Sequence, residues 1–208
     1  MMYIQLIFTK NYNLITMIEI RKNHYSFLLP IALIFLFVAG TALWHQMQII
    51  RADRAKIDAI ADAMASKHGV RPELVKAIIW KESRYRVNSV GKAGEIGLMQ
   101  IYTPAVKEWS RRTGKAVPLR LQLFNPETNI DIGTWYLKWA GSHWEGYKSA
   151  LLLQISEYNA GYGNVTDVVN GWKPKTPQDE VTLEQITIPG TRKYVRDVLR
   201  RMEALSAK

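Results

Sequence analysis

Cysteine is absent from this sequence of 208 residues, and histidine occurs only four times. The lack of cysteine excludes disulfide bonds, metal sites with thiolate ligands and lipid attachment through a thiol, although it does not exclude an oxidising compartment. The histidines, at positions 24, 45, 68 and 143, lie far apart in the chain and show no metal-ligand spacing. The sequence therefore predicts no metal site and no cofactor.

Charge is absent from residues 25–44, which read YSFLLPIALIFLFVAGTALW. This length suits a helix that crosses a bilayer once. Residues 1–24 carry three basic residues and one acidic residue, so the positive-inside rule predicts that they stay in the cytoplasm. We expect a single-pass anchor in the inner (cytoplasmic) membrane, with the chain from residue 45 onward in the periplasm. A cleaved signal segment is the alternative, since residues 38–42 form a weak cleavage site, but the apolar run is longer than a usual signal core.

Acidic residues are in the minority, with 18 Asp and Glu against 28 Lys and Arg, a net charge of +10. A basic exported domain suits an anionic wall polymer or a membrane surface. Nucleic acid is the other usual partner of such charge. No zinc-ligand spacing or RNA-recognition signature accompanies it, and the basic residues are spread out except between Lys193 and Arg201. The sequence therefore predicts no nucleic-acid partner.

Strand-like alternation and internal repeats are also lacking, and helical periodicity dominates the exported part. The apolar spacing, first-turn prolines and terminal glycines predict helices at 46–67, 72–85, 103–112, 126–141, 147–159 and 164–170 and from 191 onward. Thr103 and Thr191 are the expected N-caps of two of them. Residues 86–97 read as a loop or a short irregular hairpin, and residues 114–125 and 171–183 read as loops. We expect an all-α domain at 57–208, preceded by a stalk at 45–56.

One carboxylate stands out within these helices. Glu82 falls seven, four and three residues after the apolar positions Val75, Ile78 and Ile79, a spacing that places it on the face those residues bury. A carboxyl group on an apolar face tends to keep its proton, so its pKa rises toward the range that a general acid needs. The alternative is a glutamate at the frayed end of a helix, in solvent or paired with a nearby arginine.

Four short motifs occur in order: Glu82-Ser83, Gly97-Leu98-Met99-Gln100, Tyr158-Asn159-Ala160-Gly161 and Thr191-Arg192-Lys193-Tyr194-Val195. Together they resemble the soluble lytic transglycosylase (SLT) catalytic domain, a relative of goose-type lysozyme, over about residues 57–202. The resemblance implies a compact, helical, lysozyme-like fold with a long cleft.

The resemblance also implies an activity on peptidoglycan. The family cleaves the β-1,4 bond between N-acetylmuramic acid and N-acetylglucosamine, and the muramoyl 6-hydroxyl attacks its own anomeric carbon to leave a 1,6-anhydro end. Glu82 matches the single acid/base. Hydrolysis by a muramidase stays open, because sequence does not say which downstream carboxylate approaches Glu82; the candidates are Glu95, Glu108, Asp131, Glu145 and Glu157. A non-catalytic wall-binding or assembly module is the alternative from another class.

Further residues are implied in substrate binding by their place in the motifs. They are Ser83, Ser89, Gly97, Leu98, Met99, Gln100, Tyr158, Asn159, Glu184 and Tyr194. Gln100 offers a donor and an acceptor to an acetamido group or a hydroxyl, and the Tyr158 hydroxyl is expected to hold Glu82 or the sugar. Glu184 stands where relatives often carry a supporting acid, and Tyr194 matches a tyrosine that helps to close the cleft. Ordinary packing in turns and helices is the alternative for most of them.

Two positions depart from the family pattern. Gly91 stands where many relatives carry a serine that reaches the N-acetyl group, so either Ser89 substitutes or the contact is missing. Glu157 stands where a small residue usually precedes the Tyr-Asn pair. Its carboxylate either raises the pKa of Glu82 by repulsion or lies at a solvated edge.

An anchor joined to one exported domain, with no other domain expected, suggests where in the cell wall the enzyme acts. We hypothesise that the enzyme opens the wall locally for a secretion or conjugation machine.

Overall fold

The computed structural model describes the backbone of residues 2–167 and 169–207, and the side chains of residues 28–167 and 169–207. Helices account for 69% of it, and the described residues form no β-strand. Two isolated bridges, Val90–Ile96 and Ile96–Ile101, are the only ladder-like pairings in that described part. The predicted all-α fold is confirmed.

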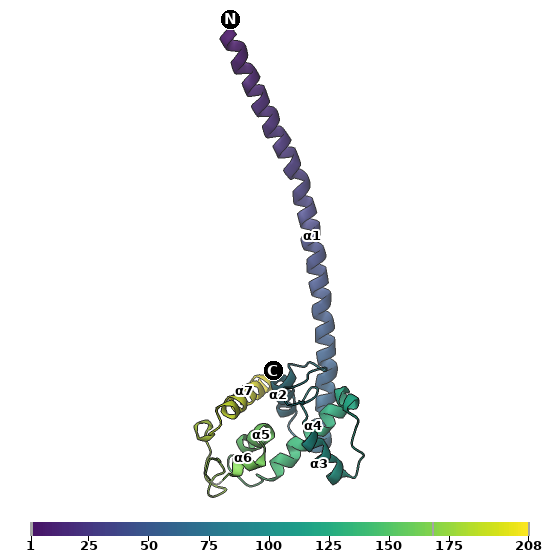
Figure 1. Ribbon diagram of the computed structural model, residues 1–208, viewed down its shortest axis with the longest axis vertical. Coiled ribbons are helices and arrows are strands. Elements are labelled where there is room, and N and C mark those ends of the chain that lie inside the picture. Colours follow the sequence, from purple (N-terminus) through teal and green to yellow (C-terminus); the bar gives the residue numbers. More distant parts are fainter. Residues whose placement is uncertain (1, 168, 208) are drawn as a thin grey trace. The chain divides into compact units, whose positions relative to one another are not determined.

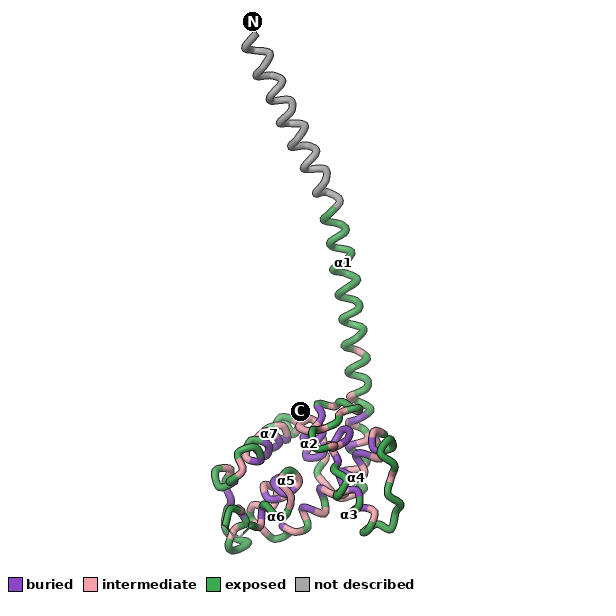
Figure 2. The backbone as a smooth tube through the Cα atoms, viewed as in Figure 1, coloured by how far each residue is buried: buried purple, intermediate pink, exposed green. Residues whose placement is uncertain are grey.

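Helix α1 (Met2–His68) contains both the predicted anchor and the helix expected at 46–67. Residues 28–46 are all exposed. The first buried residues of α1 are Ile57, Ala61 and Ala65 (Figure 2). The chain divides into two compact units, Met1–Asp53 and Arg54–Lys208. The side chains of the predicted cytoplasmic segment, residues 1–24, and those of residues 25–27 in the predicted anchor lie outside the described residues.

In the second unit, α5 lies among α4, α6 and α7 (Figure 1). Its elements after α1 are α2 (Pro72–Ser83), α3 (Thr103–Thr113), η1 (Arg120–Phe124), α4 (Pro126–Ser142), α5 (Ala150–Ala160), α6 (Tyr162–Thr166), η2 (Leu183–Gln185) and α7 (Pro189–Ser206). Helix α5 contacts α4, α6 and α7, and α2 packs against α7. The leucine-rich segment at 150–160 is therefore central, as its composition predicts.

Prolines mark where helices begin more reliably than the threonines expected as N-caps, and residues with left-handed backbone mark where α2 ends. Helix α7 begins at Pro189, so Thr191 lies inside its first turn and is not its cap; the fixed φ of proline suits that first turn. Thr103 is likewise the first residue of α3, after Tyr102 as N-cap. Helix α2 ends because Arg84 and Tyr85 adopt φ values of 54° and 64°.

The short helix expected at 164–170 lies earlier, at Tyr162–Thr166. Asp167 leaves the helical conformation, with φ −51° and ψ 134°, and ends it. Its carboxylate then accepts hydrogen bonds from the backbone amides of Val169 and Asn170 at 3.0 and 2.6 Å. The local side-chain bonds offer the backbone a turn in place of another helical turn.

Candidate active site

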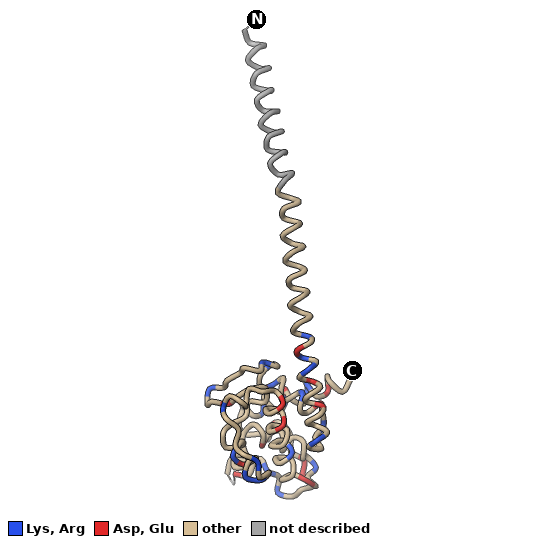
Figure 3. Tube along the Cα trace, turned by 90° about the vertical axis from the view of Figure 1, so that its right-hand side faces the viewer, with Lys and Arg blue, Asp and Glu red and all other residues tan. Residues whose placement is uncertain are grey.

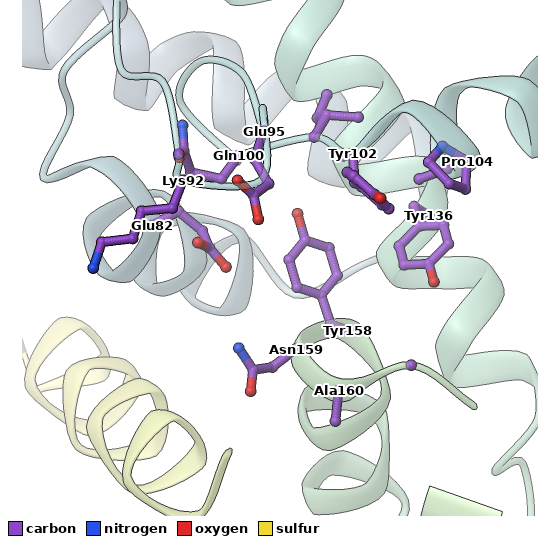
Figure 4. A pocket seen from close by; sticks show the side chains of 15 residues that line it. Glu82, Lys92, Glu95, Gln100, Tyr102, Pro104, Tyr136, Tyr158, Asn159 and Ala160 are labelled. Atoms are coloured by element: carbon purple, nitrogen blue, oxygen red, sulfur yellow. The ribbon is translucent and has the colours of Figure 1, made fainter. Parts of the chain in front are cut away.

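A cleft of about 430 Å³ lies in the second unit (Figure 4). It draws on the end of α2, the loop before α3 and the first turn of α3, the middle of α4 and the end of α5. Its lining residues are Glu82, Gly91, Lys92, Glu95, Gln100, Ile101, Tyr102, Pro104, Ala105, Gly133, Tyr136, Tyr158, Asn159, Ala160 and Gly161. Glu82, Gln100, Tyr158 and Asn159 are the site residues expected from sequence that line it.

Glu82 reaches this cleft from the last turn of α2 and is half-buried. Burial raises the pKa of Glu82 to about 7, and the charge of Glu95 adds to the rise, while a hydrogen bond from Tyr194 and the charge of Lys81 oppose it. Neighbouring Arg84 does not form the alternative ion pair, since its guanidinium lies over the Trp80 ring, 3.5 Å from the centroid. Glu82 therefore holds a proton near neutral pH and can exchange it with a bound molecule.

Tyr194 fixes the Glu82 carboxyl from the opposite helix, α7. Its hydroxyl donates to Glu82 Oε1 at 2.5 Å, and its ring is buried. Behind the ring, Lys81 Nζ lies 5.4 Å from the centroid and donates to Asp197 Oδ2 at 2.6 Å. Asp197 also accepts from Lys193 at 2.7 Å. The contact between α2 and α7 thus sets both the orientation and the charge environment of Glu82.

The turn Gly97–Gln100 contributes one residue, Gln100, to the cleft lining. Gly97, Leu98 and Met99 are buried beneath the surface, whereas Gln100 lines the cleft. Gln100 adopts φ 47°, and its Nε2 donates to the carbonyls of Gly97 at 2.8 Å and Ser89 at 3.2 Å. Both expectations for this motif hold at once: its apolar residues belong to the core, and its glutamine faces the cleft.

Asn129 of α4 holds that turn by hydrogen bonds to the backbone, and no sequence pattern predicts this role. The side chain is fully buried, and its Oδ1 accepts from Met99 N at 2.8 Å. Its Nδ2 donates to the carbonyls of Ile96 at 2.9 Å and Leu123 at 2.7 Å. A Cβ on Gly97, whose φ is 78°, would lie 2.3 Å from Asn129 Nδ2, so glycine is required at that position.

Tyr158 and Asn159 enter the cleft at the end of α5. The Tyr158 hydroxyl donates to Met99 O at 2.9 Å, so it braces the turn and does not bond to Glu82. Asn159 is exposed, and its Oδ1 accepts from the Thr191 hydroxyl at 2.9 Å. Thr191 therefore links α7 to α5, which accounts for its place in the fourth motif.

Seven predicted site residues do not line the cleft. Four of them support the residues that do, namely Gly97, Leu98, Met99 and Tyr194, and the other three lie elsewhere. Ser83 is buried and its hydroxyl donates to Ile79 O at 3.1 Å within α2. Ser89 is half-buried, with its carbonyl occupied by Gln100 and by Gly97 N at 2.8 Å. Glu184 is exposed in η2.

Neither expectation for Glu157 holds. The residue is fully buried, and its two carboxylate oxygens accept from His143 Nδ1 and Trp144 Nε1, each at 2.8 Å. Its charge is not among the causes that shift the pKa of Glu82. It is a paired core carboxylate that ties α5 to the end of α4.

The cleft also contains side chains that sequence reasoning left unassigned. Tyr102 and Lys92 are exposed on the loop that borders it, and Tyr136 projects from α4 beside Tyr158, with ring centroids 5.8 Å apart (Figure 4). Helical spacing indicated only that Tyr136 lies on an apolar face. Aromatic rings next to amide and carboxyl groups form a lining suited to a carbohydrate.

Comparison with known proteins agrees with this geometry. Residues 59–179 match the family described as the transglycosylase SLT domain. The chain belongs to this family. The match covers more than half of the chain and includes the first three of the four motifs, so the resemblance to this family is confirmed.

Relatives of this SLT domain include the membrane-bound lytic murein transglycosylase C of Yersinia pestis strain Pestoides F, which is 35% identical over 117 residues. That match covers 53% of this chain and 33% of the relative, so the chain spans only about a third of the length of the curated relatives it matches.

Solved structures share the fold. The lytic transglycosylase Slt of Pseudomonas aeruginosa, solved as an inactive mutant, superposes with a TM-score of 0.59 at 27% identity, over 72% of this chain and 24% of that one. The 70 kDa soluble lytic transglycosylase of Escherichia coli gives 0.59 at 25% identity, over 69% of this chain and 23% of that one. A complex of the 70 kDa soluble lytic transglycosylase with bulgecin A gives 0.60 at 23% identity, over 72% and 24%.

Proposed function

We propose that this chain is a peptidoglycan lytic transglycosylase that uses Glu82 as its acid and base. The observation that carries the proposal is the state of that one side chain: half-buried in a cleft, bonded to Tyr194, with a pKa raised to about 7 chiefly by burial. Family membership supports the reaction class, and the names of the relatives supply the substrate, murein.

The proposed reaction needs one carboxyl group twice. Glu82 donates its proton to the glycosidic oxygen between N-acetylmuramic acid and N-acetylglucosamine as the bond to C1 breaks. The resulting Glu82 carboxylate then accepts the proton of the muramoyl 6-hydroxyl, which attacks C1 and closes the 1,6-anhydro ring. Reuse of the acid as the base is the general logic of retaining glycosidases. The Tyr194 hydroxyl stabilises the charged form of Glu82 between the two steps.

Digestion of purified sacculi tests this proposal. The full chain should release muropeptides with anhydro ends, and Glu82→Gln should abolish release while the circular dichroism spectrum stays that of the wild type. Undiminished release by the variant would refute the assignment. Binding of the wild-type chain to sacculi with no soluble product would favour a non-catalytic wall-binding module.

A hydrolytic muramidase is the second candidate, because a second carboxylate, Glu95, lines the same cleft. Water would then attack C1 in place of the 6-hydroxyl. Mass spectrometry separates the two reactions, since a reducing end is heavier than an anhydro end by one water.

We further propose that residues 25–44 anchor the protein in the inner membrane by a single span, with residues 57–208 as the periplasmic domain and 45–56 as a stalk. Among the described residues, one helix is long and apolar enough to cross a membrane, and its apolar stretch is not buried against the rest of the protein. Its charge-free stretch appears as a continuous tan segment in Figure 3. The curated relatives named above are membrane-bound by name.

Such an anchored enzyme suits local opening of the wall for a secretion or conjugation machine. Replacement of residues 1–44 by a cleaved signal peptide tests this role. We expect wall-degrading activity to persist in the periplasm while secretion or transfer by the host strain fails. Full secretion or transfer by that strain would count against the role.

A further inference from the structure

Five carboxylates downstream of Glu82 are candidates for a second acid in the site, and the tertiary structure separates them. Glu95 is the one that lines the cleft. The other four are engaged elsewhere: Glu108 with Arg111 and Arg112, Asp131 with Lys67 and His68, Glu145 with Lys138, and Glu157 with His143 and Trp144. Among these five, Glu95 alone lines the cleft in which a bound glycan would lie.

The loop around Glu95 is built to accommodate its carboxylate. Glu95 Oε2 accepts a hydrogen bond from Ala93 N at 3.0 Å, and the backbone is closed by Gly91 N donating to Glu95 O at 2.8 Å. A Cβ on Gly91 would lie 2.1 Å from Glu95 Oε2 and 2.9 Å from Gln100 Oε1. The missing side chain at position 91 therefore leaves the space in which the Glu95 carboxylate lies.

Glu82 and Glu95 approach the cleft from two different elements, the end of α2 and the loop before α3, and Figure 4 shows both side chains directed toward Tyr158. The charged and titratable groups that face Glu82 are Lys81 from its own helix, Glu95 from the loop, Tyr158 from α5 and Tyr194 from α7. Glu95 is the carboxylate in this set and raises the pKa of Glu82, while Lys81 lowers it. Two carboxyl groups with separated tasks are a common arrangement in glycoside cleavage.

We propose that Glu95 is a second catalytic residue of this site, a carboxylate that faces the sugar ring on which Glu82 acts and stabilises the positive charge formed there. The inference rests on the proposed function. As the C1–O bond breaks, its electron pair goes to the leaving oxygen, which takes the proton of Glu82, and C1 and the ring oxygen become positive. Glu95 forms no covalent bond. The attacking hydroxyl then bonds to C1 and returns its proton to Glu82.

The test compares Glu95→Gln with Glu145→Gln, which makes the same charge change in an exposed turn after α4, outside the cleft lining. Full-length protein in detergent acts on soluble, uncrosslinked glycan strands over a range of pH. We expect Glu95→Gln to lower kcat by about 100-fold, as for loss of one preorganised electrostatic group, with little change in KM. Its rate should also begin to fall at lower pH than for the wild type, because Glu82 loses a proton more readily without the neighbouring charge. Glu145→Gln should match the wild type.

Gly91→Ala tests the same role of Glu95 by displacing its carboxylate instead of removing it. The added methyl group would displace the Glu95 side chain, and the backbone of Gly91 is not left-handed, so the fold should persist by circular dichroism. We expect kcat to fall as for Glu95→Gln, and Gly91→Ala combined with Glu95→Gln to be no worse than Glu95→Gln alone.

A wild-type kcat and an unshifted pH profile in Glu95→Gln would overturn the inference, while loss of activity in Glu82→Gln would leave the proposed function intact. A fall in kcat with no shift in pH profile would also overturn it, because Glu95 would then act only on loop structure. Lack of activity in the wild-type chain would instead refute the proposed function itself.

Discussion

At the scale of single residues, the site is shaped by a conflict between Glu82 and its surroundings. Burial disfavours the charged form of Glu82 and raises its pKa, whereas Tyr194 and Lys81 stabilise the charged form and lower the pKa. The effect of burial is the larger one. A carboxyl group held in this state is suited to proton transfer, and it lowers the stability of the fold at neutral pH. The same balance of forces therefore governs both the pH dependence of activity and that of stability.

The first prediction concerns stability. Burial raises the pKa of Glu82 to about 7 in the folded protein, above its ordinary value of 4.5. Between these values the folded state keeps a proton that the unfolded state releases, so stability falls as pH rises through this window. Glu82→Gln removes this penalty, which amounts to up to about 3 kcal/mol. We expect the variant to melt above the wild type at pH 8 and close to it at pH 4.5, in detergent.

Glu203→Gln, a change at an exposed position of α7, is the matched control and should show no pH-dependent difference. A Glu82→Gln variant that melts below the wild type at pH 8 would mean that the Glu82 carboxylate stabilises the fold.

The second prediction concerns Tyr194. Tyr194→Phe removes the hydrogen bond to Glu82 Oε1, which lowers the pKa of Glu82. The pKa should then rise further, so activity should persist to a pH higher by about one unit, given what a hydrogen bond to a charged group contributes. The maximal rate should fall, because Glu82 loses the contact that orients it. The pH profile of glycan cleavage measures both, with Tyr147→Phe outside the cleft as control. An unshifted profile would show that Tyr194 is only a packing residue.

At the scale of elements, the cleft depends on how the turn Gly97–Gln100 is fastened to helices that are distant in sequence. Asn129 of α4 bonds to three backbone groups around the turn, and the Tyr158 hydroxyl of α5 bonds to a fourth, Met99 O. Leu98 and Met99 of the turn are buried in the core, but they do not fix the path of its backbone. These polar bonds therefore keep Gln100 at the cleft.

The third prediction follows from that arrangement. Asn129→Ala leaves the backbone amide of Met99 and the carbonyls of Ile96 and Leu123 buried without their partner. Each unsatisfied group carries a desolvation cost, so we expect a loss of about 3 kcal/mol in unfolding free energy and a fall in activity. Urea denaturation followed by tryptophan fluorescence measures the loss. Asn164→Ala removes an exposed hydrogen bond from α6 to the Ala160 carbonyl at the end of α5, and it should cost less than about 1 kcal/mol.

At the scale of the whole molecule, the chain joins two units of different chemistry. The first unit exposes large apolar side chains along residues 28–50, whereas the second buries a continuous core that starts at Ile57 of α1. Lys and Arg are dispersed over the second unit in Figure 3 and do not form a single stripe. The second unit therefore has what it needs to fold in water, and the first does not.

The fourth prediction is that residues 54–208 form a soluble, folded and active fragment. The full chain should sediment with membranes and require detergent for extraction, while the fragment should remain in the supernatant and release the same products from sacculi. Centrifugation, circular dichroism and product analysis measure these outcomes. A fragment that is insoluble or unfolded would show that the second unit depends on residues before 54.

The sequence by itself determined the helices and the place of Glu82 on one of them. Apolar spacing at 3.6 residues, prolines in first turns and glycines after last turns act within a few residues, so they can be read along the chain. They gave the α2, α4 and α5 segments closely, and they failed at Thr103 and Thr191, where a proline decided the start of the helix.

Only the tertiary structure decided which side chains meet Glu82. Tyr194 lies 112 residues away in sequence and bonds to it, Glu157 is paired in the core, and Glu95 reaches the cleft because Gly91 leaves room. Asn129 gave no local sign of its role, since its three partners belong to other segments of the chain. Side chains brought together by the packing of distant elements are specified by the whole core, and no local pattern encodes them.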